Sequence, residues 1–242
     1  MITSKQNALI KQIRSLSDKK FRDRLGLFVV EGIKPVNEAV ALGMPINAII
    51  CTEKAQSSLV LNGVEAQLVT EEVLKSVSEE VTPQGALALV EKKEQGIESP
   101  TGSCLLLDGV SDPANVGAIV RTAAASGYKE IYLTGSCADA YSQKSVRASM
   151  GGIFRVKIMR GGIDEILSNL NLPIYVADMN GENVFTHQAK APLCLVIGNE
   201  GHGVSEVVKK RATVTVKIPM ENGMESLNAG VSAGILMYSL KN

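Results

Sequence analysis

The sequence predicts an α/β protein made of a smaller amino-terminal α/β domain and a larger domain whose mostly parallel sheet carries helices on both faces. Three observations support this. The chain has 242 residues, more than one domain usually contains. Short apolar runs alternate with helical patterns throughout. A polar stretch at 91–103 resembles a linker. We therefore expect domains at 1–94 and 103–242, joined by a linker at 95–102.

The first half shows the elements of a small α/β sandwich. A helix is expected from Ser4, because Leu9, Ile13 and Leu16 recur on one side of a helical pattern. Apolar runs and turn residues predict the other elements: strands at 27–30, 46–51, 66–69 and 85–90, and helices at 33–42 and 71–77.

The second half repeats this alternation more regularly. Strands are expected at 104–107, 130–134, 154–159, 174–177, 193–197 and 213–218. Helices are expected at 116–126, 142–149, 163–170, 204–211 and 227–240. Strands separated by helices favour a mostly parallel sheet covered on both faces.

Composition excludes several classes of function. The net charge is zero, so attraction to nucleic acid must come from local basic patches. No signal peptide or membrane-spanning run is visible, which predicts a cytoplasmic protein. No cysteine pair has zinc or redox spacing, and there are only two histidines, so no metal site is expected. The four cysteines are Cys51, Cys104, Cys137 and Cys194, three of them in apolar or small-residue settings that favour buried thiols.

Two segments near the carboxy terminus combine glycine and polar residues directly after strand-like runs. One is Gly198-Asn199-Glu200-Gly201-His202-Gly203, and the other runs from Ile218-Pro219-Met220 to Glu225-Ser226-Leu227-Asn228. Ligands of open α/β sheets bind at the carboxyl ends of strands. Glycines alone would equally suit tight turns, but the neighbouring carboxylates and amides favour a ligand site.

The loop after the first strand of this half lacks two common nucleotide-binding motifs. It contains neither a Gly-x-Gly-x-x-Gly fingerprint nor a Gly-Lys-Ser/Thr sequence, which argues against dehydrogenases and P-loop kinases. Instead, Asn115 and Arg121 bracket the first two turns of a helix, and Arg121 shares a face with Gly117. A helix cap with a surface arginine is the structural alternative.

Basic residues gather in two places. Lys19, Lys20, Arg22 and Arg24 form one cluster, and Lys144 and Arg147, near Arg155, Lys157 and Arg160, form the other. Both suit phosphate contacts, although the second cluster taken alone is better explained as a solvated helix face that ends at glycine. His202 is expected to be a polar loop residue, because the sequence shows no partner that would orient it as a base.

Three motifs in order resemble those of the SpoU (TrmH) family of RNA ribose methyltransferases. They are Asn115-x-Gly117-x-x-x-Arg121, Gly198-Asn199-Glu200-Gly201-x-Gly203, and Ile218-Pro219-Met220-x(4)-Glu225-Ser226-Leu227-Asn228, and the resemblance covers about 104–240. The first half is similar to a ribosomal-protein-like RNA-binding domain through Phe28-Val29-Val30-Glu31-Gly32 and the helix that follows.

The resemblance implies transfer of a methyl group from S-adenosylmethionine to a ribose 2′-hydroxyl in RNA, by a homodimer with a trefoil knot near its carboxy terminus. The segment 227–240 would contribute to the dimer contact. The implied cofactor-binding residues are Gly198, Asn199, Ile218, Met220 and Leu227. Ribosomal RNA is the expected substrate and tRNA the alternative. A non-catalytic RNA-binding protein and a base methyltransferase are further alternatives.

By the same resemblance, Arg121 matches a family residue that helps to activate the hydroxyl, and elementary chemistry suggests a role for each catalytic candidate. Arg121 would bind phosphate or stabilise the developing alkoxide, since a guanidinium is not normally a base. Asn115 would position the ribose or Arg121, and Glu200 would orient basic groups. Ser226 and Asn228 would form hydrogen bonds within the site. RNA contacts are expected from Lys19, Lys20, Arg22, Arg24, Lys144 and Arg147, and folded RNA is favoured because aromatic residues are few.

Overall fold

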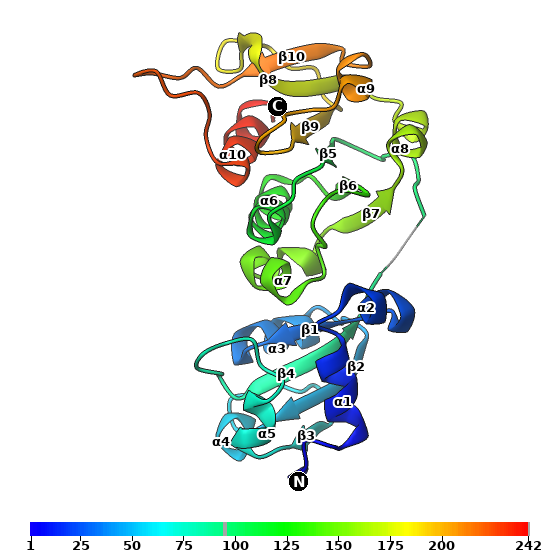
Figure 1. The fold of residues 1–242 in the computed structure, drawn as a ribbon, viewed down its shortest axis with the longest axis vertical. Coiled ribbons are helices and arrows are strands. Elements are labelled where there is room, and N and C mark those ends of the chain that lie inside the picture. Colours follow the sequence, from blue (N-terminus) through cyan, green and yellow to red (C-terminus); the bar gives the residue numbers. More distant parts are fainter. Residues whose placement is uncertain (94–95, 242) are drawn as a thin grey trace.

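The computed structural model describes residues 1–93 and 96–241. Within these residues the chain forms a four-stranded and a six-stranded sheet, one in each half (Figure 1). The expected boundary between 94 and 95 lies outside the described residues. No helix in the described part of the chain is long and apolar enough to cross a membrane.

The amino-terminal half is a mixed sheet in the order β1-β4-β2-β3. Strand β4 pairs antiparallel with β1 and β2, whereas β2 and β3 are parallel. Its elements are α1 (Ala8–Ser15), α2 (Lys19–Leu25), β1 (Leu27–Glu31), α3 (Ile33–Ala41), β2 (Ile46–Cys51), α4 (Glu53–Gln56), β3 (Ala66–Leu68), α5 (Glu71–Lys75) and β4 (Ala86–Glu91). All of the strands and longer helices expected here are present.

Helix α2 and the single turn α4 were not predicted. Most side chains of α2 are charged, so no apolar stripe marks it as a helix. Its end signals are nevertheless in the sequence, because the Asp18 side chain accepts a hydrogen bond from the Lys20 amide and Gly26 ends the helix at φ 63°.

The carboxy-terminal half is a six-stranded sheet in the order β10-β8-β9-β5-β6-β7, and all five strand pairs are parallel. The elements are β5 (Cys104–Asp108), α6 (Pro113–Ser126), β6 (Glu130–Thr134), α7 (Gln143–Ser149), the 3₁₀ helix η1 (Gly152–Phe154), β7 (Lys157–Gly161), α8 (Ile163–Asn169), β8 (Ile174–Asn183), β9 (Cys194–Gly198), α9 (Glu206–Lys209), β10 (Val214–Lys217) and α10 (Ala229–Ser239). The predicted parallel α/β class is confirmed.

Helices cover both faces of this sheet because alternate strand residues point to opposite sides. In β5, Leu105 and Leu107 belong to the apolar core beneath α6 and α10, whereas Cys104 and Leu106 belong to the core beneath α8 and α9. All four cysteines are buried free thiols.

Several element ends differ from the sequence-based expectation. Phe154, expected to start a strand, is instead the last residue of η1, and β7 begins only at Lys157. Gly152 packs so closely on α6 that a Cβ there would lie 2.9 Å from the Arg121 Cα, which holds this segment against the helix. Helix α10 begins after Asn228, because that side chain caps it.

The order of strands reverses between β5 and β9. From β5 the chain continues to β6 and β7 on one side, and from β9 it continues through α9 to β10 on the other. Such a reversal opens a crevice at the carboxyl ends of the strands. The chain then returns from the edge strand β10 to place α10 against α6 (Figure 1), and the trefoil knot stays a prediction for this return.

Candidate active site

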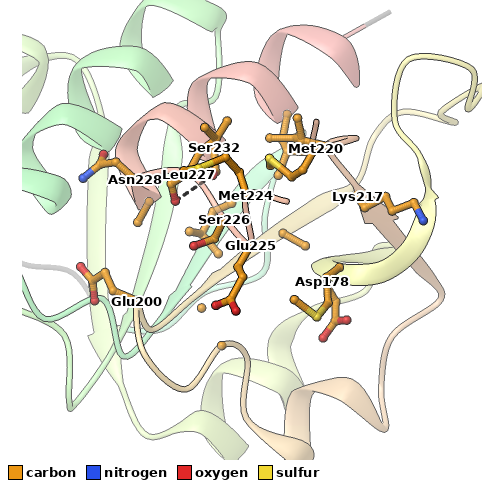
Figure 2. Close-up of a pocket in the computed structure, with 18 of the residues that line it drawn as sticks. Asp178, Glu200, Lys217, Met220, Met224, Glu225, Ser226, Leu227, Asn228 and Ser232 are labelled. Carbon is orange, nitrogen blue, oxygen red and sulfur yellow. Dashed lines mark hydrogen bonds between the residues drawn. The ribbon is translucent and has the colours of Figure 1, made fainter. Parts of the chain in front are cut away.

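A cavity of about 1120 Å³ lies at the carboxyl ends of β9 and β10 and beside the middle of β8 (Figure 2). Three segments form its wall: 177–179 at β8, 197–203 after β9, and most of 216–229 between β10 and α10. Ser232 and Leu236 of α10 complete it. Pockets that bury nucleoside-sized molecules commonly reach about 300–1,000 Å³, so a cofactor of that size fits.

Gly198 gives the loop after β9 its shape. A Cβ at this position would lie 2.5 Å from the carbonyl oxygen of Gly203. The backbone of Asn199 and that of Gly203 exchange two hydrogen bonds of 2.9 Å, which folds the loop back on the end of the strand. Only glycine permits this approach, so its role is close backbone packing within the chain.

Asn199 supports the same loop with its side chain. Its Nδ2 donates to the carbonyl of Gly109 at 2.8 Å, and its Oδ1 accepts from the amides of Gly201 and His202. The same oxygen lies 3.1 Å from Nδ1 of His202, so this exposed imidazole has an orienting partner that the sequence did not reveal.

The three sequence motifs meet in one chain of hydrogen bonds. Glu200 Oε1 accepts from Asn115 Nδ2 at 2.8 Å. Asn115 Oδ1 in turn accepts from Asn228 Nδ2 at 2.8 Å, and Asn228 Oδ1 accepts from the Gly230 amide at the start of α10. Asn115 is buried, so α6 is tied both to the loop after β9 and to the segment that leads into α10.

Glu200 is held as a carboxylate at the start of α6. Burial raises its pKa, but hydrogen bonds from Asn115 and from backbone amides, including those of Ser111 and Asp112, outweigh this and hold the pKa below its ordinary value. A carboxylate with a lowered pKa is a weak base. We therefore assign Glu200 a positioning rather than a proton-accepting role.

The cavity wall combines carboxylates with apolar side chains. Asp178, Glu200 and Glu225 line it together with one cation, Lys217, whose ammonium group points away from the carboxylates in Figure 2. Its apolar lining residues include Ile197, Ile218, Met220, Leu227 and Leu236. Acidic groups suit the ammonium and sulfonium charges of S-adenosylmethionine, and apolar groups suit its adenine, so the residues fit this cofactor.

The structure places most of the predicted site residues at the cavity. All five expected cofactor-binding residues line it, as do three of the catalytic candidates, Glu200, Ser226 and Asn228. Sequence reasoning missed Asp178 and Lys217. Asp178 follows the apolar run 174–177, where the sequence predicted that the strand ends, so the strand-end rule could have indicated it, although β8 continues to Asn183.

Arg121 does not line the cavity of its own chain. It is exposed on α6 beside η1, and within residues 1–93 and 96–241 it makes no side-chain hydrogen bond or ion pair. The guanidinium is therefore available to a group from outside this chain.

Among the predicted RNA-binding cations, Arg22 is a correction. It is 4% exposed and its guanidinium pairs with Asp139, so it has no surface for RNA. The others are exposed: Lys20 and Arg147 in solvent, Lys19 paired with Asp23, Arg24 over the Phe21 ring, and Lys144 2.9 Å from Asp112. In the described part of the chain, no group of histidine, cysteine and acidic residues could hold a metal.

The fold and the cavity define an α/β enzyme with a cofactor site at the carboxyl ends of parallel strands. The family model described as SpoU rRNA Methylase matches residues 102–238, and that described as MRM3-like substrate binding domain matches residues 7–88. The chain belongs to the SpoU rRNA methylase family, which confirms the family and the enzyme class predicted from the three motifs.

Relatives cover nearly the whole chain. It is 30% identical to the 23S rRNA (guanosine(2553)-2′-O)-methyltransferase RlmP of Bacillus subtilis (strain 168), over 99% of this chain and 98% of that protein. The AdoMet-bound rRNA methyltransferase from Sinorhizobium meliloti is 29% identical with a TM-score of 0.87, covering 99% of this chain and 96% of that one. The SpoU methyltransferase AviRb from Streptomyces viridochromogenes, in complex with AdoMet, is 27% identical with a TM-score of 0.84, covering 97% of each chain.

Proposed function

We propose that this protein transfers the methyl group of S-adenosylmethionine to a ribose 2′-hydroxyl of ribosomal RNA. The observation that carries the proposal is the hydrogen-bonded chain from Glu200 through Asn115 to Asn228, which unites the three motifs at the cavity. The rRNA specificity named for the Bacillus subtilis and Sinorhizobium meliloti relatives favours rRNA over tRNA.

The cofactor, when bound, supplies an activated methyl group, so the residues of this chain must prepare the ribose hydroxyl. Asn115 is held by Glu200 and Asn228 and orients the ribose. Ser226 lines the cavity and offers a hydroxyl to the same site. Arg121 binds an RNA phosphate or stabilises the developing alkoxide.

We infer that a second copy of the chain completes the site. Helix α10 is apolar on all sides; its inner face packs on α6, while Val231 and Tyr238 are 51% and 56% exposed. A partner would cover these side chains, and Arg121, exposed on the adjoining α6, would then face the cavity of the partner.

Sedimentation tests the dimer. Val231→Asp is expected to convert a dimer to a monomer, because it places a charge in the apolar contact. Val207→Asp is the control, since Val207 is similarly exposed but lies on α9, which covers the opposite face of the sheet. A wild-type protein that sediments as a monomer would refute the dimer.

We assign RNA contacts to the exposed cations Lys19, Lys20, Arg24, Lys144 and Arg147 and to the amino-terminal domain as a whole, which matches a substrate-binding family model. RNA affinity is expected to fall as salt rises, since phosphate contacts release counterions. Affinity that does not change with salt would contradict this assignment.

Mapping ribose methylation in total RNA from cells with and without the gene tests the function directly. We expect one rRNA 2′-O-methyl group to be lost on deletion. If the lost methyl group belongs to tRNA instead, the protein is still a ribose 2′-O-methyltransferase but its substrate is tRNA. If no methyl group is lost and calorimetry detects no S-adenosylmethionine binding, the protein is a non-catalytic RNA-binding member of the family.

Arg121→Ala separates its two roles. We expect it to slow single-turnover methyl transfer at saturating RNA, because the developing charge loses a partner. A variant that weakens only RNA affinity would limit Arg121 to phosphate binding.

A further inference from the structure

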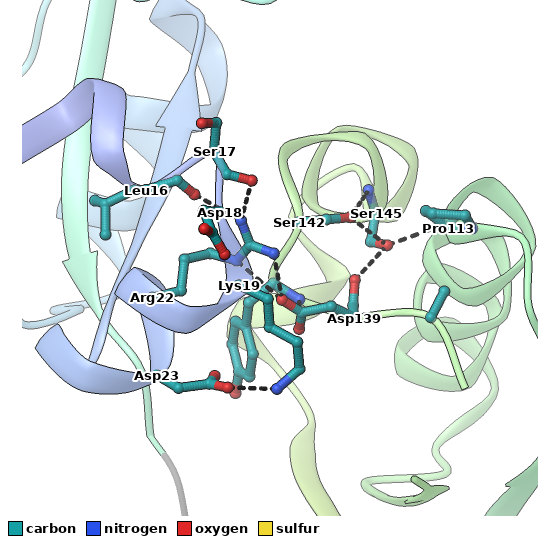
Figure 3. A network of polar contacts seen from close by, with 12 residues as sticks. Leu16, Ser17, Asp18, Lys19, Arg22, Asp23, Pro113, Asp139, Ser142 and Ser145 are labelled. Atoms are coloured by element: carbon teal, nitrogen blue, oxygen red, sulfur yellow. Dashed lines mark hydrogen bonds and ion pairs between the residues drawn. The ribbon is translucent and has the colours of Figure 1, made fainter. Parts of the chain in front are cut away.

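Arg22 joins the two halves of the molecule through a buried ion pair (Figure 3). From α2, its Nε and Nη2 donate to Asp139 Oδ2 at 2.9 and 2.7 Å. Its Nη1 donates to the carbonyls of Leu16 and Ser17 at 2.6 and 2.8 Å, so the guanidinium is bonded on both sides. Asp139 belongs to the connection between β6 and α7 in the other half.

The network continues from Asp139 to the first residue of α6. The backbone carbonyl of Asp139 accepts from Ser145 Oγ at 2.7 Å, and the same hydroxyl lies 3.0 Å from the carbonyl of Pro113 (Figure 3). Ser145 is buried on α7, which packs so closely on α6 that a Cβ at Gly117 would lie 2.6 Å from that of Ala148. The start of α6 therefore rests on Asp139 and Ser145.

This end of α6 carries one of the positioning residues of the site, Asn115. Asn115 follows Pro113 by two residues and bonds Glu200 and Asn228 at 2.8 Å each. The path from Arg22 to the cavity wall thus runs through the ion pair with Asp139, the Ser145 hydroxyl and the two residues from Pro113 to Asn115. The hydroxyl has one proton and lies within hydrogen-bond distance of both carbonyls, of Asp139 and of Pro113.

Other contacts between the halves lie beside this path, and one adjoins it, because the Tyr141 amide donates to Asp139 Oδ1 at 3.0 Å. The rings of Phe28 and Tyr141 lie 5.0 Å apart, and Arg155 forms a more exposed ion pair of 2.7 Å with Glu38. Apolar packing is continuous across the junction as well, since Phe28, Val30 and Val146 share one core. The halves therefore have other means of staying together, and the buried pair is the contact that leads to Pro113.

We propose that Arg22 and Asp139 are positioning residues for methyl transfer. Through Ser145 they fix the position of the amino-terminal end of α6, and they thereby fix the substrate-binding domain relative to the catalytic groups. The proposal rests on the proposed function, because it concerns the same site. Displacement of a catalytic group by about 1 Å can cost roughly 100-fold in rate, so small shifts of α6 have large effects.

Single-turnover methyl transfer to total RNA from a deletion strain is the first test, using Arg22→Met and Ser145→Ala. Each is expected to lower the rate at saturating RNA and cofactor by about 10- to 100-fold. Calorimetry should give an S-adenosylmethionine Kd within about twofold of wild type, since the cavity wall at β9 and β10 is not altered. Arg22→Lys keeps the charge without the forked geometry and should recover part of the rate.

Ser145→Ala tests the same path even if the Arg22 variants fail to fold. It removes the link to Pro113 and leaves the ion pair in place, so its effect cannot come from an uncompensated buried charge. The double variant should be about as slow as Arg22→Met alone, because both act on one path. The control is Asp23→Asn, which removes ion pairs with Lys19 and Lys92 next to Arg22 but within the amino-terminal half, and should keep the wild-type rate.

Hydrogen exchange in the absence of RNA gives a readout independent of activity. The first-turn amides of α6 are expected to exchange faster in Arg22→Met and Ser145→Ala, while those of β9 stay as in wild type. Unchanged α6 exchange, wild-type rates in both variants, or a loss confined to RNA affinity would each overturn the proposal. If wild type itself transfers no methyl group, the proposed function fails, and the exchange data still decide whether this path positions α6.

Discussion

Replacing Gly198 with alanine tests whether close packing of the loop after β9 shapes the cofactor cavity. The added Cβ would lie 2.5 Å from the Gly203 carbonyl oxygen. Carbon atoms rarely approach a carbonyl oxygen closer than about 3.3 Å, so the loop must withdraw by about 1 Å. That movement breaks or stretches the two 2.9 Å hydrogen bonds between Asn199 and Gly203.

The expected magnitude follows from these losses. Overpacking costs about 1–3 kcal/mol, and each backbone hydrogen bond contributes about 0.5–1.5 kcal/mol. Because Gly198, Asn199 and Gly203 line the cavity, we expect this distortion to make the binding free energy of the cofactor less favourable by about 3 kcal/mol. At about 1.4 kcal/mol for each factor of ten, the S-adenosylmethionine Kd should rise roughly 100-fold.

Calorimetric titration with S-adenosylmethionine measures this change, with a thermal melt to show that the variant is folded. Gly201→Ala is the matched control in the same loop, because a Cβ there meets only Asn199 Oδ1, at an ordinary 3.6 Å. Cofactor affinity within twofold of wild type for Gly198→Ala would refute the reasoning. So would an equal loss in the control, since the effect would then belong to the loop in general.

Three further predictions concern stability and catalysis. Gly117→Ala should lower the unfolding free energy in urea titrations by about 1–3 kcal/mol, because the added Cβ pushes α6 away from α7. Gly234→Ala should raise it by about 0.5–1 kcal/mol, because a Cβ there would have its nearest neighbour at 3.6 Å and alanine favours the helix. Burial raises the pKa of Glu31 above its ordinary value, so the stability that this group contributes is present below the unfolded pKa of about 4.3 and is lost as pH rises through the folded pKa. Glu31→Gln should therefore make the unfolding free energy depend less on pH in that window. An unchanged pH dependence would contradict this. Asn115→Ala removes a hydrogen bond to a carboxylate, which typically contributes about 1.5–3 kcal/mol, and should slow single-turnover transfer at least tenfold; a wild-type rate would exclude its positioning role.

Local pattern was sufficient for most of the fold. Apolar runs and their spacing located every strand, because strands that bury one or both faces carry apolar residues in alternating or continuous runs. Helix α2 was missed because its charged residues show no apolar stripe. Phe154, the last residue of η1, was wrongly included in the strand that begins at Lys157. The order of the strands in each sheet could not be predicted from local sequence pattern, since strand pairing joins segments that are far apart in the chain.

Through its resemblance to a known family, the sequence alone identified the family and many of the residues around the cavity, although not Asp178 or Lys217. Three ordered motifs suffice for this, since residue type and spacing record the chemistry that a site requires. Only the tertiary structure decided which groups meet. It joined Glu200 to Asn115 and Asn115 to Asn228, moved Arg121 outside the cavity of its own chain, and turned Arg22 from an expected RNA contact into a buried partner of Asp139. The sequence does not show whether a basic side chain faces solvent or a carboxylate more than a hundred positions away. The reason is that the packing of distant segments decides the burial and the partners of that side chain.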